Sequence, residues 1–588
     1  MRAARALALG LMMVAAGLAA SADSGGTRYV VLDLADRAEL EALTRLVSID
    51  RVEGTRVWAY VSPRQVAPLS AAGYTWRELP MPGGNPGARM GLLERAAIGA
   101  WDAFPTYAEY VAMMEAFAAD HPDLCRLEVI GETTNLVRPH QLLALRISDN
   151  PDLEEDEPEV FLTSSMHGDE TTGIILLLRL ADELLGHYDP GSSVPYDQRL
   201  TALVDSLEIW LNPAANPDGT YFGGDDSVAD AVRSYTDSSG RDSGVNPNRN
   251  FPDPDDGDHP DGLPWWRETE AMMAFAEAHS FVLSANFHGG AEVVNYPWDT
   301  WSRLHADDLW FVALARAYAD RAHQAATTPP HDDPWYLTDL DNGITNGYAW
   351  YTITGGRQDY MNFWHGSREV TIEVSRFKNP PGALLPMYWD YNREPLLGYL
   401  ESVLGGVRGV VTDASGAPLA ARVEVAWHDV EQDASWVETD PDVGDFHRLL
   451  LPGAYVLLIS APGYLPAAAP VTVGSGPTTR HDAVLVADGG GARTTELHGV
   501  VAHAGSGQPI AGAVVDLIWP LEEQAVTGAD GLYELAVPEG ACLLEVTAEG
   551  YQDRRLGHNA IYPDSPFDIP MLRRITAQAS GVRPMVRP

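Results

Sequence analysis

The pattern of apolar and polar positions divides this chain into regions of different secondary structure. Over residues 27–80, two extended apolar runs alternate with two segments of helical period, which predicts a small N-terminal α/β unit. Over 101–404, apolar strands and amphipathic helices alternate for much longer, as expected of an α/β domain with a mixed sheet. The residues between them, 81–100, begin with a run rich in Gly and Pro, which predicts a linker.

Short β-runs separated by Gly and Pro turns begin after residue 404, and the pattern occurs twice. The run Gly-Val-Val at 409–411 recurs at 499–501, and other turn residues recur at matching spacings. This repeat predicts two C-terminal β-sandwich domains, over 405–488 and 494–574, followed by a tail at 575–588. Neither domain carries residues typical of catalysis, so we expect them to support folding or contact a partner.

Two of the apolar strands run into histidines. The strand predicted at 159–166 leads directly to His167, and Glu170 follows three residues later. An imidazole and a carboxylate at this spacing project from the same side of a turn, so both can bind one metal ion. A second strand, 281–287, leads to His288. An isolated histidine is more often a core or capping residue, but ligands gather where such strands end, which favours His288 as a third ligand.

Two further segments carry candidate chemistry. In the strand predicted at 368–374, alternation places Glu369 and Glu373 on the face opposite the valines. A carboxylate in an otherwise apolar strand costs free energy unless it is paired or catalytic, which makes Glu373 a candidate catalytic group. We interpret Glu369 as a solvent-facing residue of an edge strand. Asn248 and Arg249 offer an amide and a guanidinium fork, which suit a terminal carboxylate.

The first residues of the chain indicate export. Arg2 and Arg5 precede an apolar stretch that ends in small residues, so residues 1–22 predict a signal peptide and a mature chain from about Asp23. No other stretch is long and apolar enough to cross a bilayer. We therefore expect a secreted or periplasmic protein without membrane insertion.

Charge and cysteine content limit the partners and the means of stabilisation. The formal net charge of -44 argues against nucleic acid and anionic membranes, because both would repel this chain. Cationic substrates are compatible with it, although surface acidity usually serves solubility. The two cysteines, Cys125 and Cys542, are too few for a disulfide framework, and we expect both to be buried thiols.

A series of motifs along the chain extends this picture. The motifs are His167-Gly168-Asp169-Glu170, Asn216-Pro217-Asp218-Gly219, Asn248-Arg249-Asn250-Phe251-Pro252, His288-Gly289-Gly290, Asn295-Tyr296-Pro297, Gly355-Gly356-Arg357-Gln358-Asp359-Tyr360 and Glu373. With these motifs in this order, the chain resembles the zinc metallocarboxypeptidases, and among these the N/E or regulatory branch in its secreted bacterial form. The resemblance spans roughly 107–404 and continues into the C-terminal domains, where the first β-sandwich resembles a transthyretin-like domain and the second another regulatory-like domain.

The resemblance implies a fold and a cofactor. The fold would be a mixed-sheet zinc carboxypeptidase domain over 101–404. One Zn2+ would be held by His167, Glu170 and His288, with water in the fourth position. Glu373 would act as the general base on that water and would pass the proton to the leaving amine.

The resemblance also implies how substrate is held. Asn248 and Arg249 would bind the C-terminal carboxylate, and Tyr351 matches a mobile tyrosine that closes over substrate. Arg233 is our choice for the arginine that stabilises the oxyanion, with Arg241 as the rival because the register between the motifs is uncertain. The residues at 245–247 depart from the Asp-Leu common before Asn-Arg in this family.

Two positions bear on substrate preference. Asp299 falls where the N/E branch places an acid in the pocket for the last side chain, and Gln358 matches a second pocket residue. A buried acid there would select C-terminal Arg or Lys by charge pairing. The alternative is that Asp299 only caps a turn.

The acidic loop 253–261 is a candidate calcium site. It lacks a calcium-loop pattern, and a solvated surface loop is the better interpretation. The loop carries Asp253, Asp255, Asp256, Asp258 and Asp261.

These observations predict a monomeric, exported zinc exopeptidase that acts on the C-termini of peptides or proteins and binds no nucleic acid. One alternative is a zinc peptidase or amidase of the same fold with another specificity, for example for cell-wall peptides. Another is a non-catalytic protein that binds through its β-sandwiches, which the retention of every expected ligand and of Glu373 argues against. The N-terminal unit is either a pro-segment that shields the site or an accessory domain.

Overall fold

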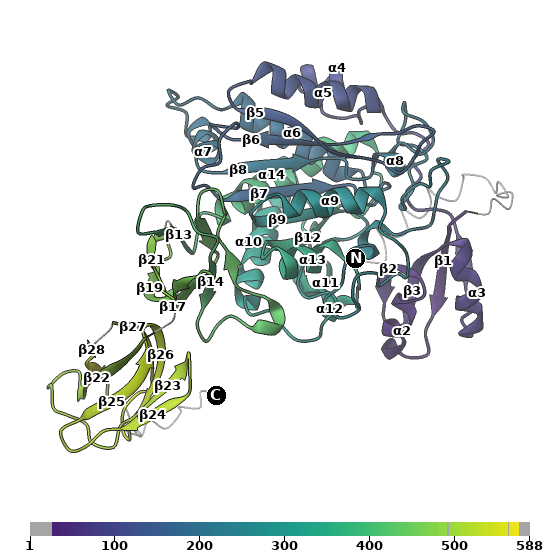
Figure 1. Ribbon diagram of the computed structural model, residues 1–588. Coiled ribbons are helices and arrows are strands. Elements are labelled where there is room, and N and C mark those ends of the chain that lie inside the picture. The colour runs from purple at the N-terminus through teal and green to yellow at the C-terminus, as the bar shows by residue number, and fades with distance from the viewer. Residues whose placement is uncertain (1–25, 477, 491–492, 562–563, 575–588) are drawn as a thin grey trace, which may run out of the picture. The chain divides into compact units, whose positions relative to one another are not determined.

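The structure, a computed structural model, describes residues 26–476, 478–490, 493–561 and 564–574 (Figure 1). The predicted signal peptide at 1–22 and the predicted tail from 575 lie outside the described residues. The chain divides into two compact units, one that ends at Met81 and also includes Asp242–Gly244, and one that contains the rest.

The N-terminal unit is a four-stranded antiparallel sheet in the order β2-β3-β1-β4 with short helices. The predicted small α/β unit is confirmed, as are its predicted strands and helices. Strand β2 was missed because its sequence, Ser-Ile-Asp-Arg-Val-Glu, has too few apolar residues to stand out. The elements are β1 (Arg28–Asp33), α2 (Leu40–Thr44), β2 (Ser48–Glu53), β3 (Arg56–Val61), α3 (Pro63–Ala71) and β4 (Arg77–Leu79).

An eight-stranded mixed sheet forms the centre of the larger unit, in the order β11-β10-β12-β9-β7-β8-β6-β5. The four neighbours β12, β9, β7 and β8 run parallel, so their carboxyl ends meet at one edge of the sheet. The strands are β5 (Cys125–Glu132), β6 (Gln141–Ile147), β7 (Glu159–Ser164), β8 (Glu208–Asn212), β9 (Phe281–His288), β10 (Glu292–Tyr296), β11 (Ile344–Asn346) and β12 (Arg368–Val374).

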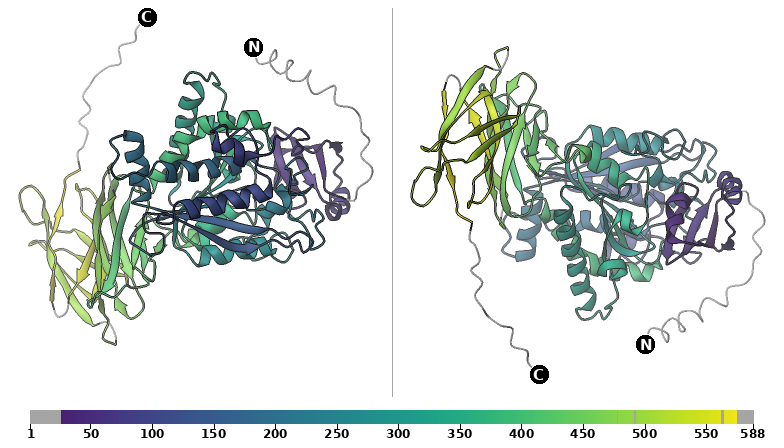
Figure 2. Two further views of the ribbon diagram at one scale, coloured as in Figure 1. Left: turned by 90° about the horizontal axis from the view of Figure 1, so that it is seen from above. Right: turned by 90° about the horizontal axis from the view of Figure 1, so that it is seen from below.

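Helices cover both faces of this sheet, as Figures 1 and 2 show. Successive residues of β7 alternate between the two covered faces: Val160 joins the apolar cluster that contains α6, and Phe161 contacts Phe275 of α9. Each such fully buried side chain stabilises the fold by about 1.5–3 kcal/mol. The helices are α5 (Tyr107–Asp120), α6 (Thr172–Gly186), α7 (Pro195–Val204), α8 (Pro217–Thr220), α9 (Arg267–Glu277), α10 (Asp308–Thr327), α11 (Asp339–Asn342), α12 (Gly347–Trp350), α13 (Arg357–Trp364) and α14 (Leu385–Ser402).

The segment predicted as a linker is more ordered than expected. Residues 81–100 contain helix α4 (Leu92–Ala97), and Leu92 is fully buried in the main core. Asn85 donates a hydrogen bond to the backbone carbonyl of Pro380 at 3.1 Å. The Gly and Pro residues indicated the loop correctly, but they gave no sign that it packs on the domain.

Strand β12 corrects the interpretation of Glu369. The strand lies between β10 and β9 rather than at an edge, and Glu369 is fully buried. Its carboxylate accepts hydrogen bonds from Arg357 Nη2 at 2.9 Å and Ser284 Oγ at 2.7 Å. Glu369 does lie on the face opposite the valines, but helix α13 covers that face, which was expected to meet solvent.

Two β-sandwiches follow, which confirms that part of the predicted fold class. The first pairs the sheet β16-β13-β21-β18, joined by β20, with β15-β14-β17-β19; the second pairs β25-β22-β28, joined by β29, with β24-β23-β26-β27. The strands are β13 (Val407–Asp413), β14 (Arg422–Val425), β15 (Val437–Glu438), β16 (Asp445–Arg448), β17 (Gly453–Ser460), β18 (Tyr464–Leu465), β19 (Ala467–Val473), β20 (Thr479–Arg480), β21 (Ala483–Ala487), β22 (Thr494–His503), β23 (Val514–Trp519), β24 (Glu523–Val526), β25 (Leu532–Pro538), β26 (Gly540–Thr547), β27 (Arg554–Ala560), β28 (Asp564–Pro566) and β29 (Ile569–Met571).

Cys125 and Cys542 are both free and buried, as predicted. Among the residues that the structure describes, no helix combines the length and the apolar character needed to span a membrane.

Candidate metal centre and substrate pocket

The turn that carries His167 and Glu170 joins the end of β7 to the start of α6. Close backbone packing shapes this turn, because a Cβ on Gly168 would lie 2.3 Å from the backbone carbon of Gly219 in α8. Asn216 holds the same turn by donating from Nδ2 to the backbone carbonyl of Met166 at 3.1 Å. The Asn-Pro-Asp-Gly motif therefore supports the His167 turn and offers no ligand itself.

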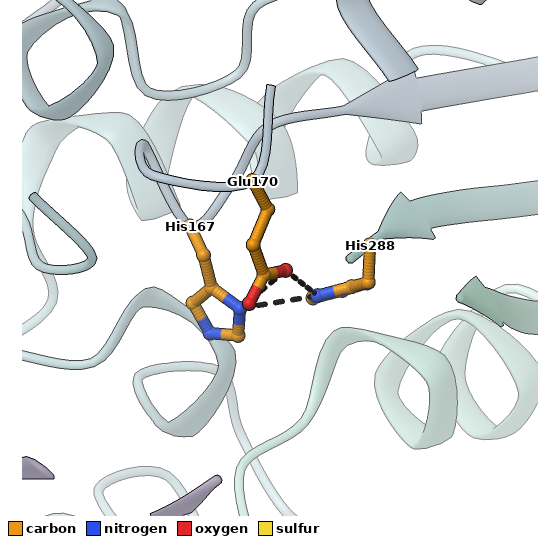
Figure 3. Close-up of side chains that lie close together, drawn as sticks. All are labelled: His167, Glu170 and His288. Carbon is orange, nitrogen blue, oxygen red and sulfur yellow. Dashed lines mark hydrogen bonds and ion pairs between the residues drawn. The ribbon is translucent and has the colours of Figure 1, made fainter. Parts of the chain in front are cut away.

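His167, Glu170 and His288 converge on one point at the carboxyl edge of the sheet (Figure 3). Glu170 Oε2 lies 3.1 Å from His167 Nδ1 and 2.8 Å from His288 Nδ1, and the two Nδ1 atoms are 3.1 Å apart. All three side chains are buried. Two imidazole nitrogens and one carboxylate oxygen at these separations form a donor set that fits a single zinc ion with a fourth position open.

The protonation states in this cluster suit a metal. Burial lowers the pKa of His167 well below its ordinary value, and the positive charge of Arg233 adds to this effect. Burial also lowers the pKa of His288. Burial opposes ionisation of Glu170, but the surrounding groups, among them the cations Lys378 and Arg233, hold its pKa well below the ordinary range. Neutral imidazoles and an ionised carboxylate are the forms that bind zinc.

Asn246 orients His167, a role that sequence reasoning did not assign to it. Its Oδ1 accepts hydrogen bonds from His167 Nε2 and from the backbone N–H of Asn248, both at 2.9 Å. The second contact fixes the orientation of the amide, so His167 carries its proton on Nε2 and presents the Nδ1 lone pair to the cluster. The departure from the family pattern at 245–247 was the available signal.

Two cations hold the other oxygen of Glu170. Arg233 Nη1 donates to Glu170 Oε1 at 2.7 Å, and Lys378 Nζ donates to the same atom at 2.8 Å. Lys378 also donates to the backbone carbonyl of Gly289 at 3.1 Å. Sequence reasoning missed Lys378, since a lone lysine after a strand resembles an ordinary surface residue.

The strand register places Glu373 beside the cluster. In the parallel pair β9 and β12, Glu373 lies directly across from His288. On the other side of β12, Glu373 pairs with Val293 of β10. Glu373 is half-buried, whereas its strand neighbours Ile372 and Val374 are fully buried. A candidate acid/base group thus lies one strand away from a candidate metal ligand.

Asn248 and Arg249 lie on a short 3-10 helix, Pro247–Arg249, and both are buried. Asn248 Oδ1 accepts a hydrogen bond from the backbone N–H of Arg357 at 2.9 Å, and Arg249 Nη1 donates to the backbone carbonyl of Asn248 at 2.6 Å. The Nε of Arg249 is buried and has no hydrogen-bond partner. The structure thus presents a guanidinium with an unused donor.

The electrostatics of Arg249 identify its neighbours. Burial lowers the pKa of Arg249, interactions with Tyr351 and with the carboxylate of Asp299 oppose this, and the positive charge of Arg233 adds to it. Tyr351 is buried at the end of α12. Tyr351, Asp299 and Arg233 therefore each lie close enough to Arg249 to affect its pKa.

Asp299 lies in a buried pocket with Gln358. Its Oδ1 accepts hydrogen bonds from Asn295 Nδ2 at 2.8 Å and from Gln358 Nε2 at 3.2 Å, whereas its Oδ2 is buried without a hydrogen-bond partner. Burial raises the pKa of Asp299 to about 6. A buried carboxylate oxygen without a donor is a site that a cation would satisfy.

Arg233, and not its rival Arg241, lies against the metal cluster. Arg241 pairs with Asp237, and its side chain is 80% exposed, whereas Arg233 donates to Glu170.

In the acidic loop, Asp253 is buried, which corrects the expectation of a solvated loop. Asp253 Oδ2 accepts from the backbone N–H of Gly355 at 2.9 Å and so links this loop to the segment before α13.

Comparison with known proteins gives matches over the same regions. The family model for zinc carboxypeptidase matches residues 110–395, and that for the carboxypeptidase regulatory-like domain matches 406–486 and 496–570. Carboxypeptidase M from Mus musculus is 35% identical over 367 residues, with 60% of this chain and 77% of the relative covered. The catalytic chain of carboxypeptidase N from Homo sapiens is 33% identical over 398 residues, with 63% of this chain and 82% of the relative covered.

A third relative is much longer than this chain. Carboxypeptidase D from Mus musculus is 36% identical over 372 residues, which cover 62% of this chain. The match spans only 25% of that relative.

Proposed function

Because the chain belongs to the zinc carboxypeptidase family, as its motifs predicted, we propose that it is a zinc-dependent exopeptidase that hydrolyses the C-terminal peptide bond of peptides and proteins. The convergence of His167, Glu170 and His288 on one point carries this proposal. Neither alternative is favoured, since the matched relatives are carboxypeptidases and every expected ligand is present.

Glu373 performs the proton transfers in this proposal. Bound zinc supplies Lewis acidity, which activates water and polarises the scissile carbonyl. Glu373 accepts a proton from the attacking water and delivers it to the departing amine. Its place across from His288 supports this role. Arg233, which donates to Glu170, would turn a further N–H toward the developing oxyanion.

Asn248 and Arg249 hold the terminal carboxylate of the substrate, and this contact makes the enzyme an exopeptidase. The buried Nε of Arg249 supports it, because a carboxylate would accept the hydrogen bond that this atom lacks. Tyr351 closes over the bound substrate from the end of α12.

Preference for C-terminal Arg or Lys follows from Asp299 and Gln358. The Oδ2 of Asp299 is buried without a donor, and a substrate guanidinium or ammonium would supply one. Gln358 holds the other oxygen of Asp299 and so fixes the orientation of the carboxylate.

Location and assembly also belong to the proposal. Residues 1–22 support export to the periplasm or the medium, and we propose that the enzyme acts as a monomer on peptide or protein C-termini. The N-terminal unit serves as a pro-segment or accessory domain, and the β-sandwiches support folding or contact a partner.

A peptide panel tests the proposal. Peptides that differ only at the C-terminal residue are assayed with the full chain before and after removal of zinc by a chelator, and again after zinc is restored. We expect release of single C-terminal residues, loss of release without zinc, and the fastest release of Arg and Lys. Release that survives complete zinc removal would contradict the mechanism, and equal rates for Arg, Leu and Glu would contradict the preference.

A further inference from the structure

A cavity of about 320 Å³ lies where the catalytic domain meets the first β-sandwich. None of the proposed active-site residues lines it. Nine carboxylate side chains and three histidines line it, and no lysine or arginine does. Acidic character of this kind attracts cations, but it does not by itself define a site.

One group of possible ligands at this cavity is already satisfied. Glu159, Glu208 and His279 bring their donor atoms within 4.8 Å of one another. Glu159, however, accepts hydrogen bonds from His279 and from a backbone N–H, and Glu208 accepts them from Trp210 and Arg146. Each carboxylate oxygen in this group has a donor, so nothing in it calls for an ion.

A second group differs in this respect. Asp156 precedes β7, and Asp445 and His447 lie on β16 of the β-sandwich; their donor atoms also lie within 4.8 Å of one another. The two-residue spacing places Asp445 and His447 on the same face of the strand. Asp445 Oδ2 lies 2.9 Å from His447 Nε2, and both residues line the cavity.

Two carboxylate oxygens in the second group lack donors. Asp445 is only 5% exposed, and its Oδ1 is buried without a hydrogen-bond partner. Asp156 Oδ1 is also buried without a partner, while its Oδ2 pairs with Arg480. Burying a carboxylate oxygen away from water costs free energy unless a hydrogen-bond donor or a cation replaces the lost hydration.

We propose that Asp156, Asp445 and His447 bind a divalent transition-metal ion that ties the first β-sandwich to the catalytic domain. Carboxylates and an imidazole suit ions such as Zn2+, whereas Ca2+ prefers sites made of oxygen alone. The site has no part in the proposed hydrolysis. It is a second metal position with ligands from two domains, and its Asp156 precedes β7, whereas His167 follows that strand.

Zinc content of the full chain tests the proposal. Wild type, Asp445→Asn, Asp156→Asn and Glu438→Gln are saturated with Zn2+ in the presence of excess Ca2+, separated from free metal and analysed for zinc per chain. Glu438 is exposed and lines the same cavity, so its variant controls for lost negative charge alone. We expect one zinc ion fewer in both aspartate variants, unchanged content in Glu438→Gln, and unchanged peptide hydrolysis in all.

Equal zinc content in wild type and Asp445→Asn would overturn the proposal, as would an equal loss in Glu438→Gln. Added Zn2+ should also raise the melting temperature of metal-free wild type more than that of either aspartate variant, which is read on the folded protein. If the catalytic centre itself bound no zinc, hydrolysis would be absent, yet the difference between wild type and Asp445→Asn would remain. The two proposals can therefore fail separately.

Discussion

In the proposed active site, some residues hold the metal and others move protons. The His167 and Glu170 pair was visible from spacing alone, and its convergence with His288 followed from the rule that ligands gather at strand ends. The roles of Asn246 and Lys378 were not predicted, because their contacts with His167 and Glu170 exist only after the chain folds; for Asn246 the sole signal was the unusual sequence at 245–247.

Glu373→Gln should abolish proton transfer and leave the metal in place. We expect kcat to fall by about 10²–10⁴-fold or more, since the amide cannot accept the proton from water. Zinc content should equal that of wild type, because Glu373 is not one of the converging ligands. Loss of zinc together with activity would assign Glu373 a ligand role instead.

Asp299→Asn should remove the preference for basic C-termini. The pKa of Asp299 is about 6, raised by burial, while Arg249 lowers it and the charge of Asp253 raises it. The carboxylate is therefore ionised above about pH 6 and protonated below it, so the Arg-to-Leu ratio of kcat/KM should fall as pH drops through that value. In Asp299→Asn the ratio should be low and independent of pH; a ratio that stays high at all pH values would refute the role.

Asn246→Ala should weaken the metal site without touching a ligand. Groups that orient a metal-bound imidazole typically contribute about 10–100-fold in metal affinity. We therefore expect faster zinc loss to a chelator, with activity restored by excess Zn2+. An unchanged rate of zinc loss would mean that packing alone orients His167.

At the scale of elements, the sheet brings the candidate groups together. Strands β7, β9 and β12 are neighbours and parallel, and each delivers a site residue at its carboxyl end. Periodicity predicted these strands well because they are strongly apolar. It failed at Glu369, since alternation shows that a side chain faces away from the valines but not whether a helix covers that face.

Gly168→Ala tests the packing of the His167 turn. The new Cβ would meet the backbone of Gly219 at 2.3 Å, so the turn must shift. We expect a loss of about 1–3 kcal/mol in the free energy of unfolding and weaker zinc retention. Gly186→Ala is the matched control, because a Cβ there has no neighbour within 4 Å; the idea fails if both variants behave alike.

At the scale of the whole molecule, buried ion pairs connect the first β-sandwich to the catalytic domain. Arg448 of β16 donates to Asp307 through Nη1 at 2.8 Å, and Arg368 of β12 donates to the same carboxylate at 2.7 Å. Both arginines and Asp307 are buried. The sequence predicted the two domains from their patterns, but it contained no sign of this connection.

Arg448→Ala should destabilise the catalytic domain together with the β-sandwich. Removing one partner of a buried ion pair typically costs about 3–5 kcal/mol, because the remaining charge loses its compensation. We expect a lower melting temperature measured by loss of hydrolysis as well as by spectroscopy. Arg422→Ala, which removes a more exposed pair with Glu424, should have little effect; hydrolysis that outlasts the melting of the sandwich would show that the domains unfold independently.

The register of β9 against β12 has a consequence for how the active site is acquired. His288 and Glu373 face each other only when these strands are aligned as observed, and a slip by one residue would turn Glu373 to the opposite face. With His167 in the turn that follows the neighbouring strand β7, the three groups come from segments far apart in the chain. A partly assembled sheet therefore cannot hydrolyse peptides. During refolding, the first appearance of activity would show when strands β7, β9 and β12 have become aligned.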